Sequence, residues 1–160
     1  MKVLFLHGLE SRPGGSKAKF LEANGFEVLN PALPRESFGE SVQTAQAVID
    51  AEKPDVVVGS SRGGAVAMSV NTVGAPVVLI APAWKRFLSS QQLQEWNIRC
   101  DPKKTIILHS PNDDLVVIED SYDIADKQGV KVIEVGEGHR MSDEDALAAI
   151  LDVTQWICRR

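Results

Sequence analysis

The stretch DVVVGSSRG, residues 55–63, decides the fold of this chain. Its first half is a short run of apolar, β-branched residues, which is typical of a strand covered on both faces. Its second half, residues 59–63, has the pattern Gly-x-Ser-x-Gly and leads into a segment rich in small residues. The stretch therefore predicts a strand, a sharp turn at Ser61 and a helix.

The two glycines of this turn have a steric reason. A sharp turn between strand and helix holds its central residue in a strained backbone conformation that costs ~1–3 kcal/mol. Side chains at positions 59 and 63 would collide with neighbouring backbone, and the helix N-terminus would offer amide donors to negative charge that develops beside Ser61. These features favour Ser61 as a nucleophile. A phosphate loop or a plain tight turn is the alternative, although the lysine of GxxxxGK[ST] and the pattern GxGxxG are both absent.

Similar apolar runs lie on both sides of this stretch and alternate with segments of helical pattern. The expected strands are residues 3–6, 27–30, 55–58, 76–80, 105–108 and 130–135. Ser37 followed by Glu40 forms a capping box before a helix. Further helix boundaries are expected at Ser16 and Asn24-Gly25, at residue 118 and Gly129, and at Ser142 with Asp145. This alternation predicts an α/β fold over a single domain, residues 1–160, with six mainly parallel, doubly wound strands and helices on both faces.

The composition narrows the class of protein. The 160 residues are 44% hydrophobic and 24% charged, values that suit one globular domain. The net charge of −5 excludes the basic footprint of a nucleic-acid-binding protein. The apolar run at the N-terminus is too short for a signal peptide or a membrane span. Cys100 and Cys158 lie in no metal or redox motif, so we expect free thiols and a cytoplasmic location.

A serine nucleophile needs a base and an acid, and both follow later strands. His139 lies in a glycine-rich loop, residues 136–140, after the last expected strand. Asp113 and Asp114 lie in the segment that leaves the fifth strand. Because parallel strands end at the same sheet edge, these side chains are expected to meet Ser61 there. The chain order serine, acid, histidine predicts a catalytic triad and leaves the choice between the two aspartates open.

These residues resemble the α/β-hydrolase superfamily along the whole chain. The matching positions are His7-Gly8-Leu9, residues 59–63, residues 113–116 and Gly138-His139. The resemblance implies that Asp113 is the triad acid and that the backbone N–H groups of Leu9 and Arg62 form the oxyanion hole. It also implies that His7 shapes its loop and that His109 is structural. Within the superfamily the chain is most similar to small cytoplasmic YqiA-type esterases and dienelactone-hydrolase-like proteins.

The chain departs from larger members of that superfamily. It has no room for leading antiparallel strands or for a cap domain, which predicts a shallow, uncapped site. Trp84 is a candidate wall for substrate, with coverage of the sheet as the alternative, whereas Leu93 and Trp96 are expected only to cover the sheet. Arg62 and Arg12 could each bind a carboxylate on the substrate. For Arg62 we expect an outward salt bridge instead, whereas for Arg12 the choice between these two roles stays open.

The function expected from these features is that of a serine hydrolase. It would cleave small carboxylic esters or thioesters through an acyl-enzyme on Ser61, with a small-molecule acyl substrate and without metal or cofactor. The triad does not set the leaving group, so a peptidase or acyltransferase is also compatible with it. The alternatives from other classes are a non-catalytic binding protein that keeps this fold and its pocket, and a nucleotide-binding protein that uses residues 59–64.

Overall fold

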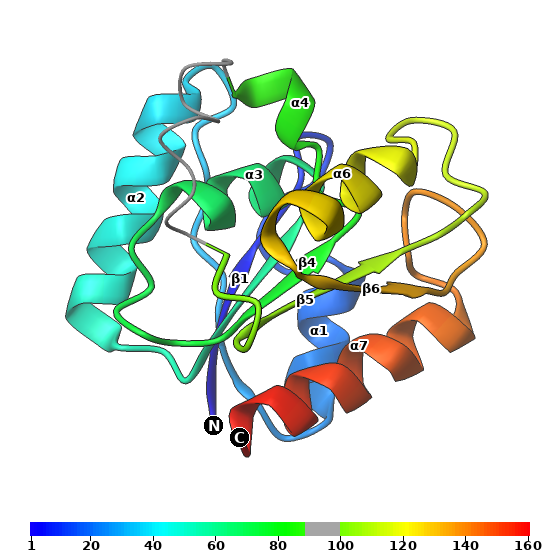
Figure 1. Cartoon of the computed structure of the whole chain (residues 1–160). Coiled ribbons are helices and arrows are strands. Elements are labelled where there is room, and N and C mark those ends of the chain that lie inside the picture. Colours follow the sequence, from blue (N-terminus) through cyan, green and yellow to red (C-terminus); the bar gives the residue numbers. More distant parts are fainter. Residues whose placement is uncertain (89–99) are drawn as a thin grey trace.

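The computed structural model describes residues 1–88 and 100–160. In this part of the chain six strands form one sheet in the order β2-β1-β3-β4-β5-β6 (Figure 1). The strands are β1 (Lys2–Leu6), β2 (Glu27–Leu29), β3 (Val56–Ser60), β4 (Val77–Ile80), β5 (Thr105–His109) and β6 (Lys131–Glu134). Every pairing is parallel, which confirms the predicted doubly wound sheet. Leu93 and Trp96 lie outside the described residues.

Helices cover both faces of this sheet (Figure 1). They are α1 (Ser16–Ala23), α2 (Phe38–Glu52), α3 (Arg62–Ser69), α4 (Trp84–Phe87), α6 (Glu119–Gln128) and α7 (Glu144–Cys158). Helices α1 and α7 pack on one face, and α2, α3, α4 and α6 pack on the other. Neighbouring residues of a strand point to opposite faces of the sheet. Leu4 packs in the core under α2, α3, α4 and α6, and Phe5 packs in the core under α1 and α7. The described residues form no separate cap domain.

Two of the four expected helix starts need correction. The Ser37 hydroxyl accepts from the Glu40 N–H at 3.2 Å and caps α2, and α6 ends at Gly129 in the left-handed conformation, both as predicted. The predicted cap at Ser16 is wrong, because Ser16 is already helical and Gly15, in an extended conformation, precedes it. Ser142 is also not a cap.

Asp143 is the residue that caps α7. Its carboxylate accepts from the Ala146 N–H at 3.2 Å and from the Glu137 N–H at 3.1 Å. A carboxylate at this position also interacts favourably with the positive end of the helix dipole, which a serine hydroxyl does not do. Through its two bonds Asp143 ties the start of α7 to the loop that follows β6.

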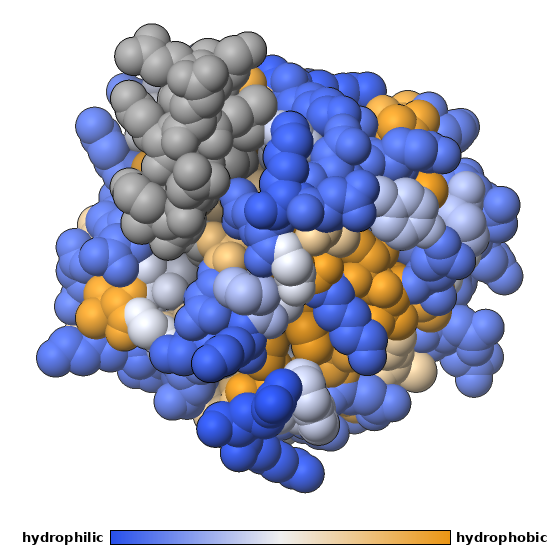
Figure 2. All heavy atoms as spheres, viewed as in Figure 1, coloured by the Kyte–Doolittle hydropathy of each residue, from blue (hydrophilic) through white to orange (hydrophobic). Residues whose placement is uncertain are grey.

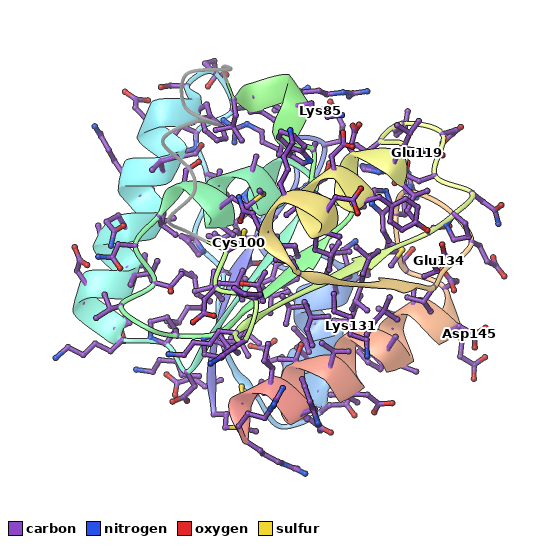
Figure 3. The ribbon with its side chains drawn as sticks, in the orientation of Figure 1. Lys85, Cys100, Glu119, Lys131, Glu134 and Asp145 are labelled. Atoms are coloured by element: carbon purple, nitrogen blue, oxygen red, sulfur yellow. The ribbon has the colours of Figure 1, made fainter. Side chains whose placement is uncertain are left out.

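The edge strand β6 carries charges at both ends. Lys131 and Glu134 are exposed, while Val132 and Ile133 between them are half-buried. Figure 2 shows hydrophobic side chains gathered between α6 and α7, over β6, and Figure 3 shows Lys131 and Glu134 flanking that strand. Charged residues on an edge strand disfavour pairing with another chain. The charges on β6 therefore protect this edge of the sheet against pairing with another chain.

Two further expectations concern cysteines and membranes. Cys100 and Cys158 are both free thiols, and burial raises the pKa of Cys100 to about 12. At neutral pH that thiol is protonated and a poor nucleophile. None of the described helices combines the length and the hydrophobicity that crossing a membrane requires.

Candidate active site

Ser61 occupies a strained turn between β3 and α3. Its backbone has φ 54° and ψ −117°, and its N–H donates to the Ile80 carbonyl at 2.9 Å. A Cβ on Gly59 would lie 2.4 Å from the Gly63 carbonyl oxygen, and a Cβ on Gly63 would lie 2.0 Å from the Leu6 carbonyl oxygen. Only glycine fits at these two positions, as the sequence predicts. The packed turn holds the strain and presents the Ser61 hydroxyl at the carboxyl edge of the sheet.

The three side chains predicted as a triad form one chain of hydrogen bonds. The Ser61 Oγ lies 3.0 Å from His139 Nε2, and His139 Nδ1 lies 2.8 Å from Asp113 Oδ2. A carboxylate only accepts, so His139 carries its proton on Nδ1 and its Nε2 accepts from the serine hydroxyl. The Asp113 side chain is fully buried, whereas 18% of the His139 side chain is exposed. Such an arrangement can remove a proton from Ser61.

The geometry favours Asp113 over Asp114 as the acid. Asp113 Oδ1 accepts from the N–H groups of Leu115 and Val116 at 2.9 Å and 2.8 Å. These bonds satisfy the buried carboxylate and hold its second oxygen toward His139. Asp114 is exposed, and its side chain takes part in none of these bonds. The turn after β5 thus selects one of the two neighbouring carboxylates.

His109 is a second histidine on the same carboxylate. Its Nε2 lies 3.2 Å from Asp113 Oδ2 and 2.9 Å from the Val116 carbonyl, so this nitrogen carries a proton and donates. Its Nδ1 lies 2.7 Å from the Ser121 hydroxyl, and the ring is fully buried. The resemblance implies a structural role for His109, and its contact with Asp113 was not predicted from the sequence. The spacing of four residues between His109 and Asp113 was the available signal.

Two backbone amides of residues that line the same cavity as Ser61 have no acceptor within the described part of the chain. They are the N–H groups of Leu9 and Arg62, the pair that the resemblance implies for the oxyanion hole. His7 shapes the loop that carries Leu9: its Nε2 accepts from the Leu33 N–H at 3.2 Å, and its Nδ1–H donates to the Gly8 carbonyl at 2.8 Å. Both ring nitrogens are thereby engaged. His7 is not available as a base for Ser61.

A cavity of about 560 Å³ opens at this edge of the sheet. It is lined by Ser61, His139, Leu9 and Arg62 together with residues of α1 and α4. The volume of this cavity lies in the ordinary range for a small-molecule site.

A smaller cavity of about 320 Å³ lies at the opposite edge of the sheet, where β4 and β5 begin, and contains none of the three triad side chains. In the described residues, no group of three or more His, Cys, Asp or Glu side chains is placed to bind a metal ion.

Comparison with solved structures identifies the architecture. The chain superimposes on a protein of the α/β superfamily from Xanthomonas campestris pv. campestris with a TM-score of 0.73, 20% identity and 97% coverage of both chains. Est1E from Butyrivibrio proteoclasticus matches with a TM-score of 0.77 at 14% identity, over 99% of this chain and 88% of that one. This chain has the α/β-hydrolase fold. The esterase domain of a Rhodothermus marinus protein shares it, with a TM-score of 0.70, 18% identity and coverage of 99% and 86%. No family model and no curated protein matches the sequence.

Within this α/β-hydrolase fold, two residues predicted to contact substrate lie elsewhere. Trp84 does not line the cavity: it is buried in the core, and its Nε1–H donates to the Asp120 carbonyl at 2.8 Å. Arg12 is exposed and also lies outside the cavity lining. Phe87, one helical turn from Trp84, lines the cavity instead. Residues three apart lie on nearly the same helix face, so sequence spacing alone did not separate these two aromatic side chains.

The Arg62 side chain points inward, which corrects the expected outward salt bridge. Its guanidinium donates to Ser41 Oγ at 3.0 Å and to the Pro34 carbonyl at 2.9 Å. It also lies over the rings of Phe38 and Phe87, 5.6 Å and 5.5 Å from their centroids. Burial lowers the pKa of this guanidinium, with a smaller opposing effect of the Glu36 carboxylate. Arg62 thus supports Phe87 beside the site, and its guanidinium is not placed for a substrate carboxylate.

Proposed function

We propose that this protein is a serine hydrolase that cleaves small carboxylic esters or thioesters through an acyl-enzyme on Ser61. The observation that carries the proposal is the pair of hydrogen bonds from Ser61 Oγ to His139 Nε2 and from His139 Nδ1 to Asp113 Oδ2, at 3.0 Å and 2.8 Å. The strained turn at Ser61 and the adjoining cavity support it.

The first step of the proposed reaction forms the acyl-enzyme. His139 Nε2 takes the proton of the Ser61 hydroxyl while Oγ attacks the carbonyl carbon of the substrate. The carbonyl oxygen becomes an oxyanion, which the N–H groups of Leu9 and Arg62 stabilise. The intermediate then collapses, the bond to the leaving oxygen or sulfur breaks, and His139 returns its proton to that atom. Throughout this step Asp113 orients the imidazole and stabilises its positive charge.

The second step regenerates the enzyme. A water molecule gives a proton to His139 Nε2 and attacks the acyl carbon, and the same two amides hold the second oxyanion. When the bond to Ser61 Oγ breaks, the proton returns to Oγ and the carboxylic acid leaves. One ester or thioester and one water thus become one acid and one alcohol or thiol.

The expected substrates are small for a structural reason. The cavity beside Ser61 measures about 560 Å³, and the described residues place no cap domain over it. The Rhodothermus marinus relative in fold is an esterase domain, which supports acyl-ester chemistry as the first class to test.

A fluorophosphonate probe tests this proposal directly. The folded wild-type protein is expected to gain one probe adduct on Ser61, observed by intact mass, and to hydrolyse p-nitrophenyl acetate. Ser61→Ala is expected to lose both, with kcat reduced about 10⁴-fold or more. Ser11→Ala is the matched control, because Ser11 also lines the cavity, whereas the side-chain hydrogen bonds of His139 go to Ser61 and Asp113. If the folded wild type neither reacts with the probe nor hydrolyses any ester, the proposal is wrong and a non-catalytic binding protein becomes the better hypothesis.

A further inference from the structure

The cavity beside Ser61 has a basic wall made by two segments far apart in the sequence. The first turn of α1 contributes Ser16 and Lys17, and the loop after His139 contributes Arg140 and Ser142. Lys17 Nζ donates to the Arg140 carbonyl at 2.5 Å and joins the two segments. Two residues with cationic side chains and two serines therefore line the cavity, which the proposed general base His139 also lines.

No carboxylate of the described residues neutralises the positive charge of this wall. Within residues 1–88 and 100–160, neither Lys17 nor Arg140 forms an ion pair with a carboxylate. Glu10, the acidic residue of the lining, is paired with Arg35 at 2.9 Å. Burial lowers the pKa of Lys17, and the nearby Arg140 charge lowers it further. In this chain, whose net charge is −5, Lys17 and Arg140 form a local site of positive charge. A bound anionic ligand would reduce the repulsion between these two cations.

A second wall of the cavity is apolar and firmly held. It consists of Leu9, Phe87 and Leu115, and 56% of the Leu115 surface is exposed. Arg86 Nη2 donates to the Leu115 carbonyl at 2.8 Å, which ties α4 to the turn after β5. Lys85, labelled on α4 in Figure 3, pairs with Asp120 of α6 at 2.9 Å and joins the two helices. Arg86 lines the cavity on this side and adds a third cation.

We propose that the substrate carries a carboxylate in addition to its scissile ester or thioester carbonyl. This inference rests on the proposed function. The carboxylate binds the wall of Lys17 and Arg140, and the hydrocarbon part of the substrate packs against Leu9, Phe87 and Leu115. Substrates of this class are half-esters of dicarboxylic acids, where the acyl group holds the anion, or esters whose alcohol part holds it. The cavity, at about 560 Å³, is large enough for the carboxylate, the hydrocarbon part and the reacting carbonyl of such a substrate.

Two substrate pairs test the proposal and separate the two positions of the anion. The acyl pair is mono-p-nitrophenyl glutarate and its methyl ester, which share one leaving group. The alcohol pair is 4-acetoxybenzoate and its methyl ester. Uncatalysed hydrolysis, which the glutarate carboxylate accelerates by attacking its own ester, is subtracted from every rate, and only the alcohol pair, whose leaving groups differ, is also divided by its uncatalysed rate constants. We expect kcat/KM for the anionic member of at least one pair to exceed that of its neutral partner about fivefold at low salt. The difference should lie mainly in KM and shrink toward unity in high salt.

Charge-removing variants assign the effect to this wall. Lys17→Met and Arg140→Gln are each expected to reduce the preference for the anionic substrate toward unity. Arg12→Gln is the matched control, because it removes an exposed charge from the same loop region outside the cavity and should leave the preference unchanged. The rate of fluorophosphonate labelling is measured in each variant, since Lys17 also anchors the loop of His139.

The outcomes separate the two proposals. If the wild type reacts with the probe and hydrolyses neutral and anionic members equally, the substrate class is wrong while the serine hydrolase stands. The same holds if a preference is present but survives in both Lys17→Met and Arg140→Gln. Absence of labelling and of hydrolysis for all four substrates overturns the proposed function and this inference with it.

Discussion

His109 donates a hydrogen bond to Asp113 Oδ2 across 3.2 Å, and this is the same oxygen that accepts from His139. Ser121 lies 2.7 Å from the other ring nitrogen of His109, and the ring is fully buried. Because Asp113 Oδ1 is held by two backbone N–H groups, His109 completes the restraint on the carboxylate. We therefore expect it to position Asp113 for His139.

Replacement of His109 by two side chains of similar shape tests this role. Gln can place an N–H donor where Nε2 lies, whereas Met cannot, and both lose the bond to Ser121. We expect His109→Met to lower kcat for p-nitrophenyl acetate about tenfold with little change in KM, because a buried hydrogen bond to a charged group is worth about 1.5–3 kcal/mol. His109→Gln should retain most of kcat. Equal losses in the two variants would mean that His109 only fills space.

The strain at Ser61 predicts an effect on stability that opposes function. At φ 54° and ψ −117° a residue with a Cβ is strained, and glycine is not. Ser61→Gly and Ser61→Ala both remove the hydroxyl, and only Gly also relieves the backbone. We expect the glycine variant to be about 0.5–1 kcal/mol more stable than the alanine variant after the entropic cost of glycine. Urea denaturation of the two inactive proteins measures the difference, and an alanine variant of equal or greater stability would contradict it.

Gly63 predicts a severe steric effect. An added Cβ would lie 2.0 Å from the Leu6 carbonyl oxygen in the neighbouring strand, and backbone there cannot move without disrupting the sheet. We expect Gly63→Ala to lower the free energy of unfolding by about 3 kcal/mol or more. Gly39→Ala in α2 is the control, because its Cβ would meet nothing within 4 Å and alanine favours a helix. A thermal melt in which Gly63→Ala matches the wild type would refute the close packing of this turn.

The inward direction of Arg62 predicts a loss of stability without a change in substrate preference. Arg62→Met removes two hydrogen bonds and leaves the Pro34 carbonyl without this donor, which we expect to cost about 2 kcal/mol. The ratio of kcat/KM for anionic and neutral esters should stay that of the wild type. If that ratio collapses while stability is kept, the guanidinium binds substrate after all.

Much of the architecture follows from local patterns in the sequence. The apolar runs are short and β-branched because both faces of the sheet are covered, so the six strands and the α/β class could be predicted from them. The turn at Ser61 was predictable because sterics require glycine at both position 59 and position 63. The order of Ser61, Asp113 and His139 after separate strands was sufficient to place them at one edge. Their hydrogen bonds are consistent with that expectation, and the catalytic roles are what the labelling experiment tests.

The directions of long side chains were decided by the tertiary structure alone. Arg62 turns inward because Ser41, Pro34 and two aromatic rings from other segments receive it. Lys17 and Arg140 meet although 123 positions separate them, since the start of α1 and the end of β6 reach the same edge of the sheet. A local sequence pattern indicates only the types of residue and their periodicity. These contacts depend instead on which distant segments become neighbours when the helices pack on the sheet. The sequence by itself therefore determined the fold and the placement of Ser61, and only the packed chain decided which charges surround it.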